Sequence, residues 1–70
     1  MTIRERETLA FIYKFKIEHD YAPTISEIKA GINTHSDSHV RDILESLKAD
    51  GYIDYKKRSP RTIRILKIPI

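Results

Sequence analysis

The 70-residue sequence has no cysteine, only two glycines and only three prolines. The absence of cysteine excludes disulfides and thiolate metal sites, and it fits a reducing compartment such as the cytoplasm. No apolar run approaches the roughly 20 residues that a membrane-spanning helix needs, and the amino terminus lacks the apolar segment of a signal peptide. We therefore expect a single small domain over residues 1–70, located in the cytoplasm and without membrane contact.

The sequence contains signals for the start of three helices. Thr2-Ile3-Arg4-Glu5 and Thr24-Ile25-Ser26-Glu27 both match the capping box, in which the threonine hydroxyl and the glutamate side chain each satisfy a free backbone N–H. Ser36 is a good N-cap for a third helix. These signals predict helices from Thr2 to about His19, from Thr24 to Ile32 with Asn33 as terminator, and from Ser36 to about Asp50, where Gly51 stops the helix.

The apolar residues indicate which helix faces are buried. Val40, Ile43, Leu44 and Leu47 follow one another at i, i+3, i+4 and i+7, which is an amphipathic stripe. The first helix has a wider apolar arc, with Leu9 and Ile12 expected at its buried centre. Either Phe11 and Phe15 or Tyr13 and Ile17 then cover a second element.

The last part of the chain predicts a β-hairpin. Tyr52–Tyr55 is typical of a strand, residues 56–60 of a loop, and Arg61–Leu66 of a returning strand with alternating apolar residues. Three helices followed by a hairpin predict an α+β fold, a three-helix bundle with a two-stranded β-hairpin wing. This is the winged helix-turn-helix layout.

The surplus positive charge lies in the hairpin. Residues 51–70 hold six basic residues against one acidic residue, a net charge of +5, whereas the whole chain carries +3. A basic hairpin beside a nearly neutral helical body indicates a surface that lies along a phosphate backbone. The predicted backbone contacts in the hairpin are Lys56, Lys57, Arg58 and Arg61. The alternative is that these cations only protect an exposed strand edge from aggregation.

Only residues 33–35 separate the second and third helices, the spacing of a DNA-binding helix-turn-helix, whose second helix enters the major groove. Its outward side chains include types that can read base edges: Arg41 can bind guanine, Asp42 or Glu45 can accept from cytosine, and Ser38 can address either. Thr24, Ser26 and Ser36, at the amino ends of the two helices, are predicted to add backbone contacts. The alternative is an ordinary solvated helix face.

From Thr2 to Leu66 the pattern resembles the amino-terminal domain of the LexA repressor family. The matching stretches are Thr2-Ile3-Arg4 with Glu7, Tyr21-Ala22-Pro23-Thr24 with Glu27-Ile28, Ser36 with Ser38, Leu44 to Leu47, Gly51-Tyr52-Ile53, and Arg61-Thr62-Ile63-Arg64-Ile65-Leu66. The resemblance implies a wing that touches the DNA backbone. It also implies that the family's base-contacting positions are occupied here by Ser36, Ser38, His39, Arg41 and Asp42.

The sequence departs from the family pattern at Ala22, where a proline is usual, and at Asn33, where a glycine is usual. Family repressors also continue into a self-cleaving domain that dimerises them, whereas this sequence stops at Ile70. The sequence is therefore either a cut fragment of such a repressor or a naturally free-standing regulator, such as a phage or mobile-element protein. Because the apolar stretch 65–70 is unlike an interdomain linker, we expect a complete small protein.

These observations favour a sequence-specific, double-stranded DNA-binding transcriptional regulator, a repressor, over a protein-binding adaptor or antirepressor on the same scaffold. We expect no catalysis, cofactor or small-molecule ligand. We also expect no metal site, because a helix capped by Ser36 leaves His35 outside it, so that His35 and His39 do not share the i, i+4 helix face that zinc motifs use. A domain this small covers a half-site, which predicts a homodimer on a palindromic site. Its contact is expected on spare apolar surface at Phe11, Phe15, Tyr21 or residues 68–70.

Overall fold

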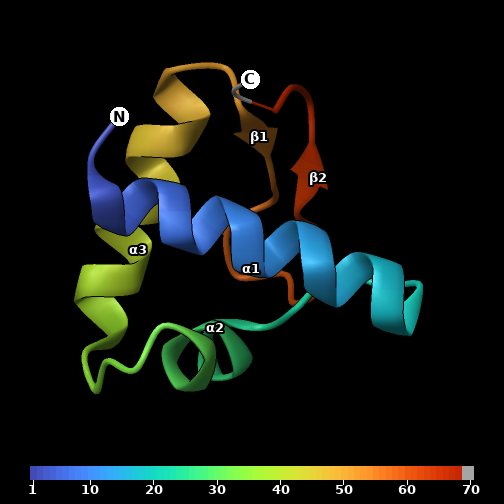
Figure 1. The fold of residues 1–70 in the computed structure, drawn as a ribbon, viewed down its shortest axis with the longest axis horizontal. Coiled ribbons are helices and arrows are strands. Elements are labelled where there is room, and N and C mark those ends of the chain that lie inside the picture. The colour runs from blue at the N-terminus through green and yellow to red at the C-terminus, as the bar shows by residue number, and fades with distance from the viewer. Residues whose placement is uncertain (69–70) are drawn as a thin grey trace.

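The computed structural model describes residues 1–68. The chain forms three helices, α1 (Ile3–His19), α2 (Ile25–Gly31) and α3 (Asp37–Ala49), followed by two short antiparallel strands, β1 (Ile53–Asp54) and β2 (Arg64–Ile65). Figure 1 shows α1 lying across α3, with α2 below α1 and the hairpin beside α3. The predicted α+β winged helix-turn-helix fold is confirmed. Among residues 1–68, no helix is both long and apolar enough to cross a membrane.

All three predicted helix starts are confirmed. Thr2 accepts the Glu5 backbone N–H while the Glu5 side chain accepts that of Thr2, and Thr24 and Glu27 form the same pair of bonds. The Ser36 hydroxyl accepts the N–H of His39 and caps α3. The end of α2 was predicted one residue too late. The helix stops at Gly31, although Asn33 takes the left-handed conformation expected of a terminator, with φ 58°.

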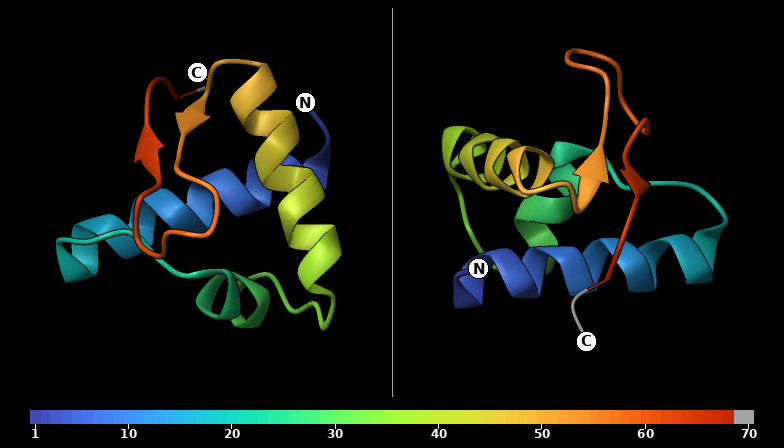
Figure 2. Two further views of the ribbon diagram at one scale, coloured as in Figure 1. Left: turned by 180° about the vertical axis from the view of Figure 1, so that it is seen from behind. Right: turned by 90° about the horizontal axis from the view of Figure 1, so that it is seen from above.

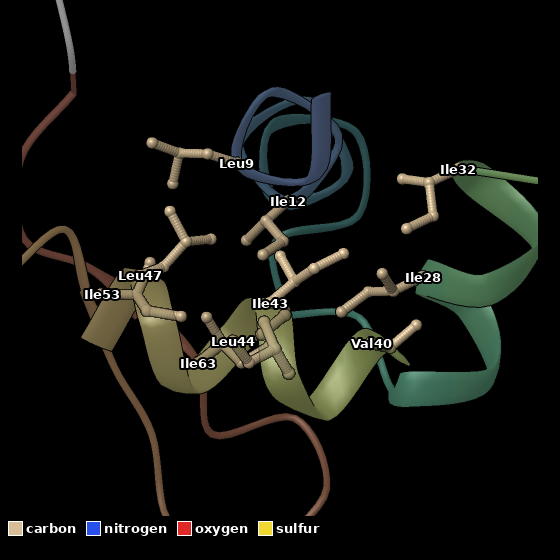
Figure 3. Packing of buried hydrophobic residues seen from close by; sticks show 11 residues of the cluster. Leu9, Ile12, Ile28, Ile32, Val40, Ile43, Leu44, Leu47, Ile53 and Ile63 are labelled. Atoms are coloured by element: carbon tan, nitrogen blue, oxygen red, sulfur yellow. The ribbon is translucent and has the colours of Figure 1, made fainter. Parts of the chain in front are cut away.

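A single apolar core joins the helices to the hairpin. Figure 3 shows side chains of α1, α2 and α3 pointing toward one another, with the hairpin residues Ile53 and Ile63 beside them. Leu9 and Ile12 lie at the buried centre of α1, as predicted. Of the two pairs left open on α1, the ring of Phe11 packs against the core, whereas Tyr13 and Ile17 are 46% and 62% exposed. The buried core residues are Leu9, Ile12, Ala22, Ile28, Ile32, Val40, Ile43, Leu44, Leu47, Ile53 and Ile63.

The strand predictions for 52–55 and 61–66 were too long, because only two residues of each form ladder pairs. Ile53 lies opposite Ile65, and Asp54 opposite Arg64. Beyond this point Arg58 and Arg61 adopt left-handed backbone conformations, with φ 63° and 60°, which interrupt an extended strand. The hydroxyl of Thr62 also accepts the Lys56 N–H at 2.9 Å, a role that a ladder carbonyl would otherwise have.

Candidate nucleic-acid interface

The long connection between the strands, residues 55–63, is here called the wing loop. Figure 2 shows that this loop projects on the side of the molecule away from α1 and comes close to the start of α2. The wing loop, the outer face of α3 and the amino end of α2 together line one groove of about 780 Å³, here called the cationic groove. Arg41 from α3 and Lys57 from the wing loop both line it. The structure therefore brings the predicted base reader and the predicted backbone contact to one surface.

Most of the predicted site residues meet in the cationic groove. Those that line it are Thr24, Ser26, Arg41, Glu45, Lys56, Lys57, Arg58 and Arg61. The other four, Ser36, Ser38, His39 and Asp42, lie outside its lining and are exposed on the amino-terminal turns of α3 or at its N-cap. The hydroxyls of Ser36 and Ser38 lie 3.1 Å apart and form a hydrogen bond.

An ion pair spans the turn between α2 and α3. Lys29 Nζ lies 2.6 Å from Asp37 Oδ1, and the hydrogen bond from Lys29 is the main reason that the pKa of Asp37 falls below its ordinary value. Asp37 is the first residue of α3, where a negative charge interacts favourably with the helix dipole but would repel a nearby phosphate. Lys29 offsets that repulsion. Lys29 was not among the site residues predicted from the sequence.

Glu45 is bound to the wing loop in the free protein. The Tyr55 hydroxyl donates a hydrogen bond to Glu45 Oε2, and Lys57 Nζ lies 3.8 Å from Glu45 Oε1. The bond from Tyr55, more than the charges of Lys57 and Lys48, lowers the pKa of Glu45. The predicted cytosine acceptor is therefore ionised but already has a partner, Tyr55, which was not among the site residues predicted from the sequence.

Arg61 is also engaged within the protein. Its guanidinium donates to both carboxylate oxygens of Glu27, at 3.0 and 3.2 Å, and to the carbonyl of Ala22 at 3.0 Å. The guanidinium also lies 4.5 Å from the centre of the Tyr21 ring, a cation–π distance. The role of Arg61 as a DNA backbone contact stays a prediction.

The described residues contain no cluster of three or more histidine, cysteine or acidic side chains placed to hold a metal ion. The polar side chains of the cationic groove are instead cations, hydroxyls and carboxylates, several of them paired with one another. Cations and hydroxyls exposed along one groove, with a helix face between them, can bind phosphates and base edges. The arrangement is suited to binding an extended anionic partner.

Comparison with known proteins identifies similar sequences. Residues 1–62 match the sequence model described as the LexA DNA binding domain. The LexA repressor of Roseiflexus sp. (strain RS-1) is 40% identical over 65 residues, which is 93% of this chain and 30% of that protein. The LexA repressor of Clostridium novyi (strain NT) is 39% identical over 67 residues, which is 96% of this chain and 33% of that protein. The chain thus spans about a third of the length of these relatives.

Proposed function

This chain belongs to the LexA DNA-binding domain family, and on that premise we propose that it is a sequence-specific, double-stranded DNA-binding regulator that represses transcription by occupying promoter DNA. In this proposal α3 lies in the major groove and the wing loop lies along the phosphate backbone. A role on chromosomal or phage DNA places the protein in the cytoplasm. The proposed activity is binding rather than catalysis.

One observation carries the proposal: Arg41 and Lys57 line the same groove although they come from different elements. A helix face alone is shared by every surface helix, and a cationic loop alone is compatible with edge protection. Side chains suited to base edges and cations suited to phosphates are useful together only if one partner offers both groups. Duplex DNA offers both, base edges in its major groove and phosphates along its backbone.

The roles of the side chains follow from their chemistry and position. Arg41 is proposed to bind guanine, and Asp42 or Glu45 to accept from cytosine. The remaining proposed base contacts are Ser36, Ser38 and His39. The proposed backbone contacts are Thr24, Ser26, Lys56, Lys57 and Arg58, with Arg61 treated separately below.

The test is selection of binding sites from random duplexes, followed by titration of the selected duplex at several salt concentrations. If about four phosphates are neutralised, the plot of log affinity against log salt concentration should have a slope of about −3 to −4. Arg41→Ala should weaken binding by about 1–3 kcal/mol on duplexes with its preferred base and much less on others. Lys57→Ala should weaken binding to all duplexes alike and make the slope shallower by about 1.

Two outcomes would contradict the proposal. Absence of duplex binding at low salt would remove the function itself. Selection of the same motif by the wild type and by Arg41→Ala would remove the assigned role of Arg41. Leu44→Ala is a folding control, because Leu44 is 1% exposed and its truncation should cost about 2–5 kcal/mol of stability.

We further propose that two copies bind a palindromic site, because one α3 helix covers only a half-site. Tyr21 and Ile68 are 46% and 49% exposed, and Phe11 and Phe15 are partly exposed; the other predicted contacts, residues 69 and 70, lie outside the described residues. Sedimentation of the protein with a selected duplex and with a half-site duplex gives the stoichiometry. One copy on every selected duplex would contradict this proposal.

The second candidate function is a protein-binding adaptor. It is favoured by a separate groove of about 810 Å³, between α1 and the end of the hairpin, whose lining includes the exposed apolar residues Tyr13, Ile17, Leu66 and Ile68. The DNA titration separates the two candidates, because an adaptor has no need of a salt-dependent affinity for duplex DNA.

A further inference from the structure

We propose that Arg61 is a positioning residue that fixes the wing loop against the amino end of α2. The effect of Arg61 on DNA affinity rests on the proposed function, whereas its effect on the position of the wing loop concerns the free protein. The guanidinium joins two surfaces that each contribute proposed backbone contacts, the cations 56–58 of the wing loop and Thr24 with Ser26 at the start of α2. Arg61 thereby sets the spacing at which these two surfaces meet the phosphates.

The geometry supports a fastening role because the guanidinium has several protein partners at once. Nη1 donates to the Ala22 carbonyl and to Glu27 Oε1, both at 3.0 Å, and Nη2 donates to Glu27 Oε2 at 3.2 Å. One face of the group lies over the Tyr21 ring. Such a bidentate, stacked arrangement fixes both the position and the orientation of the side chain.

Glu27 connects this fastening to the helix-turn-helix itself. Its Oε1 accepts the backbone N–H of Thr24 at 2.8 Å as well as the Arg61 guanidinium. The same carboxylate therefore caps α2 and holds the wing loop. A displacement of Arg61 relative to α2 lengthens its bonds to Glu27.

The backbone conformation at position 61 indicates that an arginine is present for its side chain rather than for the shape of the turn. Its φ of 60° lies in the left-handed region, which glycine or asparagine adopts at lower cost. A turn selected only for its shape would favour one of those residues. Arginine adds the guanidinium that reaches Glu27.

The DNA affinity of Glu27→Gln distinguishes this positioning role of Arg61 from direct binding of a phosphate. Glutamine retains the capping box, since it serves at the N3 position as glutamate does, but it removes the charge and one of the oxygens that Arg61 uses. If Arg61 fixes the wing loop, this variant should bind the selected duplex about two- to fivefold more weakly. If Arg61 contacts phosphate, the variant should release it and bind as tightly as the wild type or more tightly.

The chain offers a matched control. Glu5→Gln makes the same change in the capping box of α1, where Glu5 pairs with Thr2, and it should leave DNA affinity unchanged. Arg61→Lys keeps the charge but loses the planar fork, so it should weaken binding nearly as much as Glu27→Gln. Arg61→Asn, which tolerates the left-handed backbone, should weaken binding without making the salt slope shallower by about 1.

A second measurement needs no DNA. The Lys56 N–H is bonded to the Thr62 hydroxyl inside the wing loop, so its hydrogen exchange should be faster in Glu27→Gln and Arg61→Asn than in the wild type and Glu5→Gln. Unchanged exchange in both variants, or undiminished duplex affinity of Glu27→Gln, would overturn the proposal. If the wild type binds no duplex, the proposed function fails, and the exchange rates still decide whether Arg61 fixes the wing loop.

Discussion

At the scale of single residues, Tyr55 connects the wing loop to the helix that is proposed to read bases. Its partial burial, followed by its bond to Glu45, raises the pKa of the Tyr55 phenol above its ordinary value of 10. The proton that bonds Glu45 is therefore retained throughout the physiological pH range. Tyr55 occupies Oε2 of Glu45, so a cytosine amino group accepted by this carboxylate would share it with the Tyr55 hydroxyl.

Tyr55→Phe should release Glu45 without removing the ring from its place beside the core. The pKa of the Glu45 carboxyl should rise toward its ordinary value of 4.5, since the hydroxyl is the main cause of its lowering. Carbon-13 NMR of the glutamate carboxyl across a pH titration measures this directly. Tyr13→Phe, which removes an exposed hydroxyl from α1, is the control, and an unchanged Glu45 titration in Tyr55→Phe would contradict the assignment.

At the scale of elements, Gly31 explains how closely α1 and α2 approach. A Cβ atom added at this position would clash with Cε1 of the Phe11 ring, closer than real Cβ contacts occur. The glycine is therefore required for the contact between the two helices rather than for a special backbone angle at the helix end. This contact holds α2, and with it the amino end that lines the cationic groove.

Gly31→Ala should destabilise the fold by up to about 2.5 kcal/mol. Alanine gains about 0.5–1 kcal/mol in a helix through reduced backbone entropy, but displacing a packed aromatic ring costs about 1–3 kcal/mol. Urea unfolding of the four proteins in a Gly31→Ala and Phe11→Leu cycle measures the two terms separately. The alanine should be neutral or stabilising in the Phe11→Leu background, where the ring is absent. A stabilising effect in the wild-type background would show that the Phe11 ring moves freely.

The helices could be predicted from sequence because their signals are local. Two capping boxes, the Ser36 cap and the apolar stripe of α3 each lie within a few turns of the backbone that they determine. The close approach of Phe11 to Gly31 was missed because it depends on how two helices pack, which no short pattern encodes.

The wing loop and the pairing within the site were less predictable. The strand-and-loop pattern of the sequence placed the cations 56–58 in a loop, but the predicted strand lengths were wrong because Thr62 and the left-handed Arg61 replace ladder geometry. The outer face of α3 could be predicted from the helical spacing of its apolar residues. The partners of its acids did not, because Tyr55 lies ten residues from Glu45 and Arg61 lies 34 residues from Glu27.

At the scale of the whole molecule, ionised carboxylates connect the elements that form the cationic groove. Each has a pKa below its ordinary value, and in each case the principal cause is one hydrogen bond. The carboxylates and their principal donors are Glu27 with the Thr24 backbone, Asp37 with Lys29, Glu45 with Tyr55, and Asp54 with Arg64. The Glu27 bonds link α2 to its own cap and, through Arg61, to the wing loop. The Asp37 bond links α2 to α3, the Glu45 bond links α3 to the wing loop, and the Asp54 bond links β1 to β2.

This arrangement predicts that acid destabilises the fold. A carboxyl whose pKa is lower in the folded state stabilises it above the unfolded pKa, and this contribution is lost as pH falls through the folded value. The ordinary values are 4.5 for glutamate and 3.8 for aspartate, so the urea midpoint should be level from pH 7 to about 5 and fall below about 4.5. Glu27→Gln should show a smaller decrease than the wild type, because it lacks one of these carboxyls. Equal wild-type urea midpoints at pH 7 and pH 3 would contradict this prediction. They would mean that ionised carboxylates stabilise the folded and the unfolded state equally.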